Sequence, residues 1–293
     1  MTRTRTKGHT LKSICEYIGI SQQAYHKRLK KDERKSEIYD FAEKIVIENR
    51  KKKSRSGLRS IYYKEKELAC LGINQFEKQM SLRGHALKPY KKHVKTTDSS
   101  GDHYKFDNLV SGLKINGDNQ VIVGDITYYQ NNTGLYYIFH FVDYYTLEVK
   151  GLIGSKNMCG VNAEKCLRQI FQYNRKRKYN HFLIIHTDGG GQYRSHKFQA
   201  MLSNAQIKPS HAKNCLENGL SERENGIIKN HYLLDYDVKN ENHLNSILRK
   251  IKHQINHVWP TETLYNMTPS RYAEHVRKID IRKRVVKTIK VVE

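Results

Sequence analysis

The sequence predicts an α/β protein with a mixed sheet that carries helices on its faces, preceded by an all-helical region. Three observations support this fold class. Apolar side chains recur at helical spacing through residues 11–82, whereas β-forming and helical runs alternate from residue 120 onwards. Residues 131–134 (Asn-Asn-Thr-Gly) separate the first two β-forming runs in the manner of a hairpin turn. With 293 residues, the chain is long enough for two or three domains.

The N-terminal region predicts a helix-turn-helix over residues 11–31. The first helix ends before Gly19, and the side chain of Ser21 is suited to cap the second. Polar side chains at the start of that second helix are candidates for contacts with base edges: Gln22, Gln23 and Lys27. The alternative is an ordinary helical hairpin. Further helices are predicted over residues 37–52, 58–71 and 74–82.

The α/β part follows a basic, aperiodic stretch. Predicted strands cover residues 120–129, 134–143, 147–153 and 181–186, with a short strand at Ile207. Predicted helices cover residues 160–173 and 195–204, and another begins near Asn218. We therefore divide the chain into a helical DNA-binding region (1–87), a basic linker (88–105), an α/β core (106–235) and a C-terminal helical extension with a basic tail (236–293).

The charge of the chain indicates a polyanionic partner. Fifty-three Lys and Arg residues against 29 Asp and Glu residues give a formal net charge of +24. Several separated basic clusters favour a surface that follows a nucleic-acid backbone over a single solvated tail. An anionic membrane surface is the alternative, but no apolar run approaches the roughly 18 residues that a membrane span needs. Five cysteines without metal-ligand spacing predict free thiols in a reducing cytosol.

Two predicted strands carry an aspartate where a carboxylate is costly to bury. Asp125 interrupts an otherwise β-forming run, and Asp188 lies where a buried strand opens into a glycine turn. The following helix carries one polar face, formed by Asn218, Glu222, Asn225 and Lys229, and Glu222 can return to the sheet edge near both aspartates. Three convergent carboxylates suit Mg²⁺ or Mn²⁺, and two such ions support displacement at phosphorus. The alternatives are a strand-end turn for each aspartate and a solvated stripe for the helix.

Three sequence blocks together resemble the catalytic blocks of insertion-sequence transposases of the OrfB type, whose core is similar to retroviral integrases. The blocks are residues 124–128 (Gly-Asp-Ile-Thr-Tyr), 186–193 (His-Thr-Asp-Gly-Gly-Gly-Gln-Tyr) and 217–223 (Glu-Asn-Gly-Leu-Ser-Glu-Arg). The resemblance also covers residues 256–272, and the N-terminal helices more loosely. It implies an RNase H-like core with Asp125, Asp188 and Glu222 as an acidic triad that binds two divalent ions.

The same resemblance implies a function and partners. The expected protein is a DDE transposase that cleaves the ends of its own element and joins the 3′-hydroxyl to double-stranded DNA. Asn218 and Lys229 match positions that contact DNA, and Gln192 and Tyr193 are expected to line the same cleft. A homo-oligomer on DNA, a separate upstream helix-turn-helix subunit and a bacterial, nucleoid-associated cytoplasmic location are also expected. The alternatives are a structure-specific nuclease on the same fold and a catalytically idle DNA-binding regulator.

Overall fold

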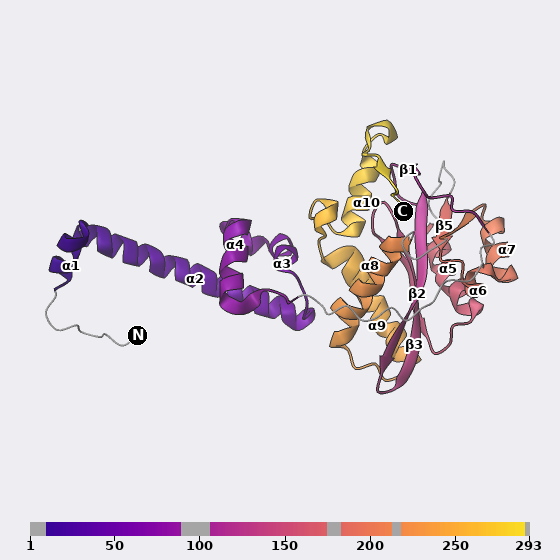
Figure 1. Ribbon diagram of the computed structural model, residues 1–293, viewed down its shortest axis with the longest axis horizontal. Coiled ribbons are helices and arrows are strands. Elements are labelled where there is room, and N and C mark those ends of the chain that lie inside the picture. Colours follow the sequence, from indigo (N-terminus) through magenta and orange to yellow (C-terminus); the bar gives the residue numbers. More distant parts are fainter. Residues whose placement is uncertain (1–9, 89–105, 175–182, 213–217, 291–293) are drawn as a thin grey trace.

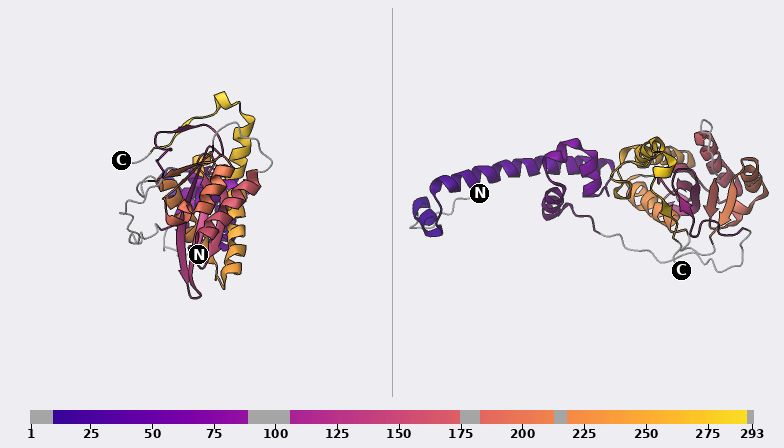
Figure 2. Two further views of the ribbon diagram at one scale, coloured as in Figure 1. Left: turned by 90° about the vertical axis from the view of Figure 1, so that its right-hand side faces the viewer. Right: turned by 90° about the horizontal axis from the view of Figure 1, so that it is seen from above.

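The computed structural model describes residues 10–88, 106–174, 183–212 and 218–290. A long helical arm at the N-terminus projects from a body that is built around a mixed sheet (Figure 1). Seen from above, the arm extends away from a body that contains the rest of the described chain (Figure 2, right). Residues 89–105 of the predicted linker, and residues 181–182 of one predicted strand, lie outside the described residues.

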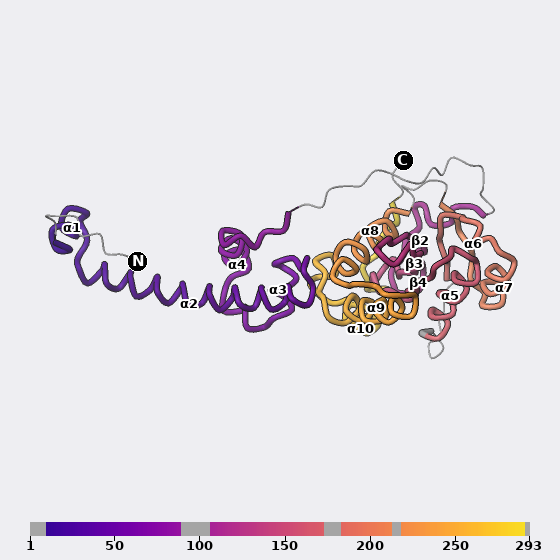
Figure 3. Tube along the Cα trace, turned by 90° about the horizontal axis from the view of Figure 1, so that it is seen from below, coloured from indigo at the N-terminus to yellow at the C-terminus, as the bar shows by residue number. Residues whose placement is uncertain are grey.

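The tip of the arm contains the turn that the sequence predicts. Helix α1 (Leu11–Ile18) ends at Gly19, which takes a left-handed conformation with φ of 76°. Helix α2 (Gln22–Lys52) begins after Ser21, whose hydroxyl accepts a hydrogen bond from the Ala24 amide at 3.1 Å. The predicted end of the second helix near residue 31 is wrong, because α2 continues to Lys52 as one helix (Figure 3). Residues 32–36 lack apolar spacing but contain neither Gly nor Pro, so nothing in them breaks a helix.

The base of the arm is a small helical cluster. Helix α3 (Leu58–Lys64), η1 (Lys66–Cys70), α4 (Ile73–Met80) and η2 (Ser81–His85) pack against the C-terminal part of α2. Their buried side chains include Val46, Ile61 and Phe76, each fully excluded from solvent. The helix predicted over residues 58–71 is therefore split into two short pieces, with the break at Glu65.

The sheet of the body has five strands: β2 (Val121–Asn131), β3 (Gly134–Asp143), β4 (Val149–Ser155), β5 (Ile184–Thr187) and β6 (Lys208–His211). Their order is β4-β3-β2-β5-β6. Strands β2, β3 and β4 pair antiparallel, whereas β5 and β6 run parallel to β2. The predicted hairpin forms at Asn131 and Gly134, which pair as the last residues of the β2–β3 ladder. This arrangement confirms the predicted RNase H-like mixed sheet.

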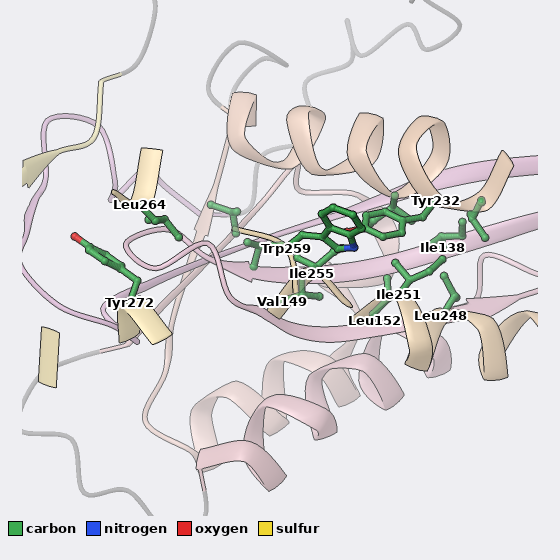
Figure 4. Packing of buried hydrophobic residues seen from close by; sticks show 14 of the residues in the cluster. Ile138, Val149, Leu152, Tyr232, Leu248, Ile251, Ile255, Trp259, Leu264 and Tyr272 are labelled. Atoms are coloured by element: carbon green, nitrogen blue, oxygen red, sulfur yellow. The ribbon is translucent and has the colours of Figure 1, made fainter. Parts of the chain in front are cut away.

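Each face of the sheet is covered by its own helices. Helices α5 (Gly160–Asn174), α6 (Gly191–Arg194) and α7 (His196–Asn204) bury one apolar cluster with Ile122 and Phe139. Helix α8 (Gly219–Ile227), η4 (Ile228–Tyr232), η5 (Leu233–Asp235) and α9 (Glu241–His253) bury the opposite face. The close view of this second cluster shows Trp259 and Tyr232 packed with the α9 side chains Leu248 and Ile251 (Figure 4).

The C-terminal residues return to the start of the core. After η6 (Gln254–Val258) and η7 (Glu262–Leu264) come α10 (Pro269–Lys278), η8 (Ile281–Lys283) and β7 (Lys287–Thr288). Strand β7 pairs antiparallel with β1 (Lys114–Ile115). From α10, Arg277 donates to the buried carboxylate of Asp118 at 2.6 Å. None of the helices in the described parts of the chain is long and apolar enough to cross a membrane.

Candidate active site

The two aspartates predicted from sequence belong to neighbouring inner strands of the sheet, Asp125 within β2 and Asp188 directly after β5. Parallel pairing joins Val123 of β2 to His186 of β5. Continued by two residues, this register would bring Asp125 opposite Asp188, which directly follows the last residue of β5. Asp125 is partly buried within β2, whereas Asp188 follows the last residue of β5 and is exposed.

Local backbone geometry explains two glycines beside these aspartates. A Cβ on Gly124 would lie 2.2 Å from the ring of Phe141, so only glycine fits where β2 passes that ring. Gly189 has φ of 72°, which turns the chain away from the sheet directly after Asp188. The amide of Gly190 then donates to Asp188 Oδ1 at 3.1 Å, which holds the carboxylate at the C-terminal end of β5.

Helix α8 brings the third carboxylate over β2. Asn218, at the N-cap, donates from Nδ2 to the Gly124 carbonyl at 3.3 Å. Asn225 donates from Nδ2 to Asp125 Oδ2 at 2.8 Å. Glu222 lies between these two amides at i+4 and i−3, on the helix face that both of them direct towards the sheet. Glu222 is itself exposed.

Asp188 and Glu222 both act on the carboxylate of Asp125 through their negative charge. Burial, followed by the negative charge of Asp188, raises the pKa of Asp125 to about 7, and Glu222 adds to this rise. Hydrogen bonds from the Ile126 amide and from Asn225 oppose it. Loss of hydration also raises the pKa of Asp188. Clustered carboxylates with raised pKa values are relieved by a cation, and such shifts are typical of functional sites.

The three carboxylates nevertheless do not converge on a single metal position among the described residues. Among the described residues, no group of three His, Cys, Asp or Glu side chains lies close enough to hold a metal ion. Asn225 occupies one oxygen of Asp125. Polar atoms around α8 are also left without a partner within the described residues, among them Asn218 Oδ1, Asn225 Oδ1 and Ser221 Oγ. Oxygen atoms of this kind match the ligand chemistry of Mg²⁺ and of ordered water.

Two of the side chains that the sequence predicts to contact DNA are buried in the structure. Asn218 is 5% exposed, and its side-chain amide donates to the carbonyl of Gly124. Tyr193 is 1% exposed and packs edge-on against Phe141 and Phe198. Helix α6 covers the apolar cluster on the α5 face of the sheet, and Tyr193 points from α6 into that cluster. Asn218 therefore positions α8, and Tyr193 belongs to the core.

Gln192 and Lys229, the other two predicted contacts near the carboxylates, are partly exposed. A Cβ on Gly190 would meet Gln192 Oε1 at 2.9 Å and Asp188 Oδ1 at 3.3 Å, so the Gln192 amide lies beside the Asp188 turn. Lys229 is partly exposed, with its ammonium 4.9 Å from the centroid of the Tyr128 ring. Both side chains stay candidates for contacts with a substrate phosphate.

The arm presents the other predicted contacts far from the carboxylates. Gln22, Gln23 and Lys27 are all exposed at the start of α2. Figure 1 shows this end of α2 at the far end of the molecule from β2 and α8. A contact with DNA at these side chains stays a prediction.

Sequence reasoning missed His140 at the site and gave Asn225 no role. The sequence places Asn225 on the same helix face as Glu222, but its contact with Asp125 was not predicted. His140 pairs with Asp125 across the β2–β3 ladder, so the hairpin turn at residues 131–134 already fixed their proximity. Complete burial lowers the pKa of His140 to about 4, so the imidazole is neutral at physiological pH.

Comparison with known proteins gives a family match over part of the body. The model of a family described as the integrase core domain matches residues 116–214, a range that contains Asp125 and Asp188 and ends before Glu222. An uncharacterized 31 kDa protein of the insertion element IS600 from Shigella sonnei is 25% identical over 274 residues, which are 89% of this chain and 97% of that protein. The transposase InsF of the insertion sequence IS3fB from Escherichia coli is 38% identical over 100 residues, about a third (34%) of each chain.

Solved structures give more distant likenesses. The catalytic core domain of HTLV-2 integrase in complex with magnesium is 24% identical, with a TM-score of 0.42 over 57% of this chain and 99% of that one. A simian T-cell lymphotropic virus intasome is 20% identical, with a TM-score of 0.49 over 78% of this chain and 74% of that one.

The sheet and the matched residues are those of an integrase core domain over residues 116–214. The chain is similar to proteins of insertion sequences, one of which is a transposase over the matched third.

Proposed function

We propose that this chain is a DNA transposase that cleaves the ends of its element and joins the freed 3′-hydroxyl to DNA, with Asp125, Asp188 and Glu222 as its acidic triad. The observation that supports the proposal is the pairing of β2 with β5 just before Asp125 and Asp188, with the helix of Glu222 held on Asp125 by Asn225. DNA transposition and integration are also the activities that the matched family and the relatives support.

Two divalent ions, Mg²⁺ or Mn²⁺, fit the donor set of this site. Asp125 and Asp188 would hold them from the sheet, and Glu222 would hold them from α8. When bound, such ions activate an attacking oxygen and stabilise a leaving oxygen at phosphorus. The raised pKa of Asp125 supports this assignment, because a cation offsets the repulsion between the carboxylates.

Other side chains of the chain position the reacting groups. Asn225 holds the Asp125 carboxylate, and Asn218 fixes the start of α8 on β2. Lys229 follows Glu222 by two helical turns on the same helical segment, where its ammonium suits a DNA phosphate as a point charge. Gln192 is placed to orient the Asp188 turn or a phosphate beside it.

The arm would recognise the element end. Its exposed side chains Gln22, Gln23 and Lys27 suit base edges and phosphates, and the charge of +24 supports tight, salt-dependent binding to duplex DNA. We assign residues 1–87 to this role and residues 106–235 to catalysis, with the extension 236–293 packed on the core. A homo-oligomer on DNA, an upstream helix-turn-helix subunit as partner and a nucleoid-associated location in a bacterial cytoplasm complete the proposal.

Incubation with labelled element-end duplex and Mg²⁺ tests this function. We expect the wild-type chain to give both a nicked strand with a free 3′-hydroxyl and a longer, joined product. Nicking without any joined product would indicate the nuclease alternative, and binding without either product would indicate the idle regulator. Glu274→Gln, an exposed carboxylate of α10, serves as the control that loses one charge away from the site.

A further inference from the structure

A lysine is buried at the junction between the arm and the body. Lys53, the residue that caps the C-terminus of α2, is 9% exposed. Its ammonium lies 4.4 Å from the centroid of the Tyr232 ring and 4.8 Å from that of Trp259. Burial lowers the pKa of Lys53 to about 8, although the charges of Asp235 and Glu224 favour its protonated form.

The Tyr232 ring belongs to the same helical segment as Glu222. Helix α8 passes into η4 through Ile228, which keeps right-handed helical angles, so the segment runs on to Tyr232. Ten residues separate Glu222 from Tyr232, a rise of about 15 Å. Glu224, on the buried side of α8, is 3% exposed, and its pKa is raised to about 7 by burial. One end of this segment therefore approaches the carboxylates, and the other approaches Lys53.

Neighbouring contacts fasten the same junction. The amide of Ser54 donates to Asp235 Oδ2 at 3.0 Å, and its hydroxyl donates to Asp235 Oδ1 at 2.5 Å. Ser60 donates to the carbonyl of Pro260, the residue after Trp259, at 2.8 Å. Figure 4 shows Trp259 and Tyr232 side by side above the sheet. The arm thus contacts both segments that supply the two rings.

We propose that Lys53 is a positioning residue that couples the arm to the active site, because its ammonium between Tyr232 and Trp259 fixes the far end of the Glu222 segment. This inference rests on the proposed function. An apolar side chain would fill this place without the cost of removing a charge from water. An ammonium over two aromatic faces instead gives a directional contact that exists only while the arm is docked.

Fluorescence tests the contact without any catalytic activity, because Trp259 is the only tryptophan of the chain. It is 5% exposed in the docked arrangement. In Lys53→Met we expect emission shifted to longer wavelength and stronger quenching by acrylamide. Lys53→Arg keeps the cation and should keep the wild-type spectrum. Lys239→Met, an exposed lysine beyond the same segment, is the matched control for the lost charge.

Strand cleavage tests the coupling. At saturating element-end DNA, Lys53→Met should lower the cleavage rate constant about tenfold or more, since a desolvated cation–π contact is lost. Its Kd for the same DNA should stay within about twofold of wild type, because no proposed DNA contact is altered. Lys53→Arg should recover most of the rate, and circular dichroism should confirm that all variants fold.

Hydrogen exchange decides the proposal even if the wild-type chain does not cleave DNA, an outcome that counts against the proposed function alone. Amides of residues 219–232 should exchange faster in Lys53→Met than in wild type, Lys53→Arg or Lys239→Met. Unchanged exchange and unchanged Trp259 emission would overturn the coupling. Wild-type cleavage by a Lys53→Met variant in which Trp259 has become accessible would overturn it too.

Discussion

The sheet and the tip of the arm use their side chains in opposite ways. Strand β3 buries almost every residue from Tyr136 to Asp143, whereas α2, with 31 residues, buries only Ala42, Val46 and Asn49. In the sheet, packing and register therefore decide where a functional group lies. On the arm, side chains such as Gln22 are exposed and free of packing, so they remain available to contact a partner. Lys53 lies at the junction between the exposed arm and the packed body.

The largest expected effect is the loss of cleavage and joining without any change in the arm. Asp125→Asn, Asp188→Asn and Glu222→Gln keep the shape of each side chain but remove the charge that would hold a cation. We expect each to lower cleavage and joining by at least about 10⁴-fold, about 5 kcal/mol in activation free energy. Gel-shift affinity for element ends should stay near that of wild type.

Glu274→Gln provides the control, with activity close to wild type. Near-normal strand transfer by any one of the three amide variants would remove that residue from the triad. It would also weaken the idea that register in the sheet sets the chemistry.

A stability comparison addresses the packing difference directly. Phe141 is 1% exposed, stacks on Phe198 at 6.4 Å between ring centroids and lies against Gly124. Phe141→Ala should lower the free energy of unfolding by about 3–5 kcal/mol. Leu29→Ala, on the arm where Leu29 is 44% exposed, should change it by about 0.5 kcal/mol or less. Urea denaturation followed by circular dichroism measures both, and similar costs would contradict the contrast between the two regions.

Recognition should be lost from the arm without loss of chemistry. Replacing Gln22, Gln23 and Lys27 together by Ala should lower the preference for cognate ends over scrambled duplex by about 10²-fold, since each base contact is worth about 1–3 kcal/mol. Cleavage at saturating DNA should be unaffected. The measurement is competition binding at one fixed salt concentration. A triple variant that still selects cognate ends as wild type does would move recognition into the body.

The smallest expected effect is a pH dependence of stability that arises in the core alone. Because burial and Asp188 raise the pKa of Asp125 to about 7, the folded chain holds a proton there that the unfolded chain has released above about pH 4. The stabilisation from this proton is lost as pH rises through 7. Without divalent ions, we expect a loss of about 2 kcal/mol between about pH 5 and 8.

Asp125→Asn should remove part of this slope, and denaturant melts at several pH values will show it. Glu224, whose pKa is also raised to about 7 by burial, adds a slope of the same sign that the variant retains. Equal slopes in wild type and Asp125→Asn would mean that Asp125 keeps an ordinary pKa in the folded chain.

Much of the fold was predictable because it depends on local chemistry. The hairpin at residues 131–134 follows from turn residues between two β-forming runs, and the caps at Gly19 and Ser21 follow from backbone preference and side-chain reach. Helix α2 was predicted too short because apolar spacing stops before the helix does. The pairing of β1 with β7 was not predicted, because it joins short segments more than 170 residues apart.

The sequence by itself determined the residue types of the candidate site: one aspartate within a strand, one after the end of a strand, a glutamate on a helix face and a strongly basic chain. Only the tertiary structure decided which neighbours those residues have. In the folded chain, Asp125 is contacted by Asn225 instead of by solvent, and Asn218 and Tyr193 are buried. The ammonium of Lys53 contacts two rings of the body. Spacing along the chain specifies a face of one element, but the contacts of that face depend on which distant element packs against it.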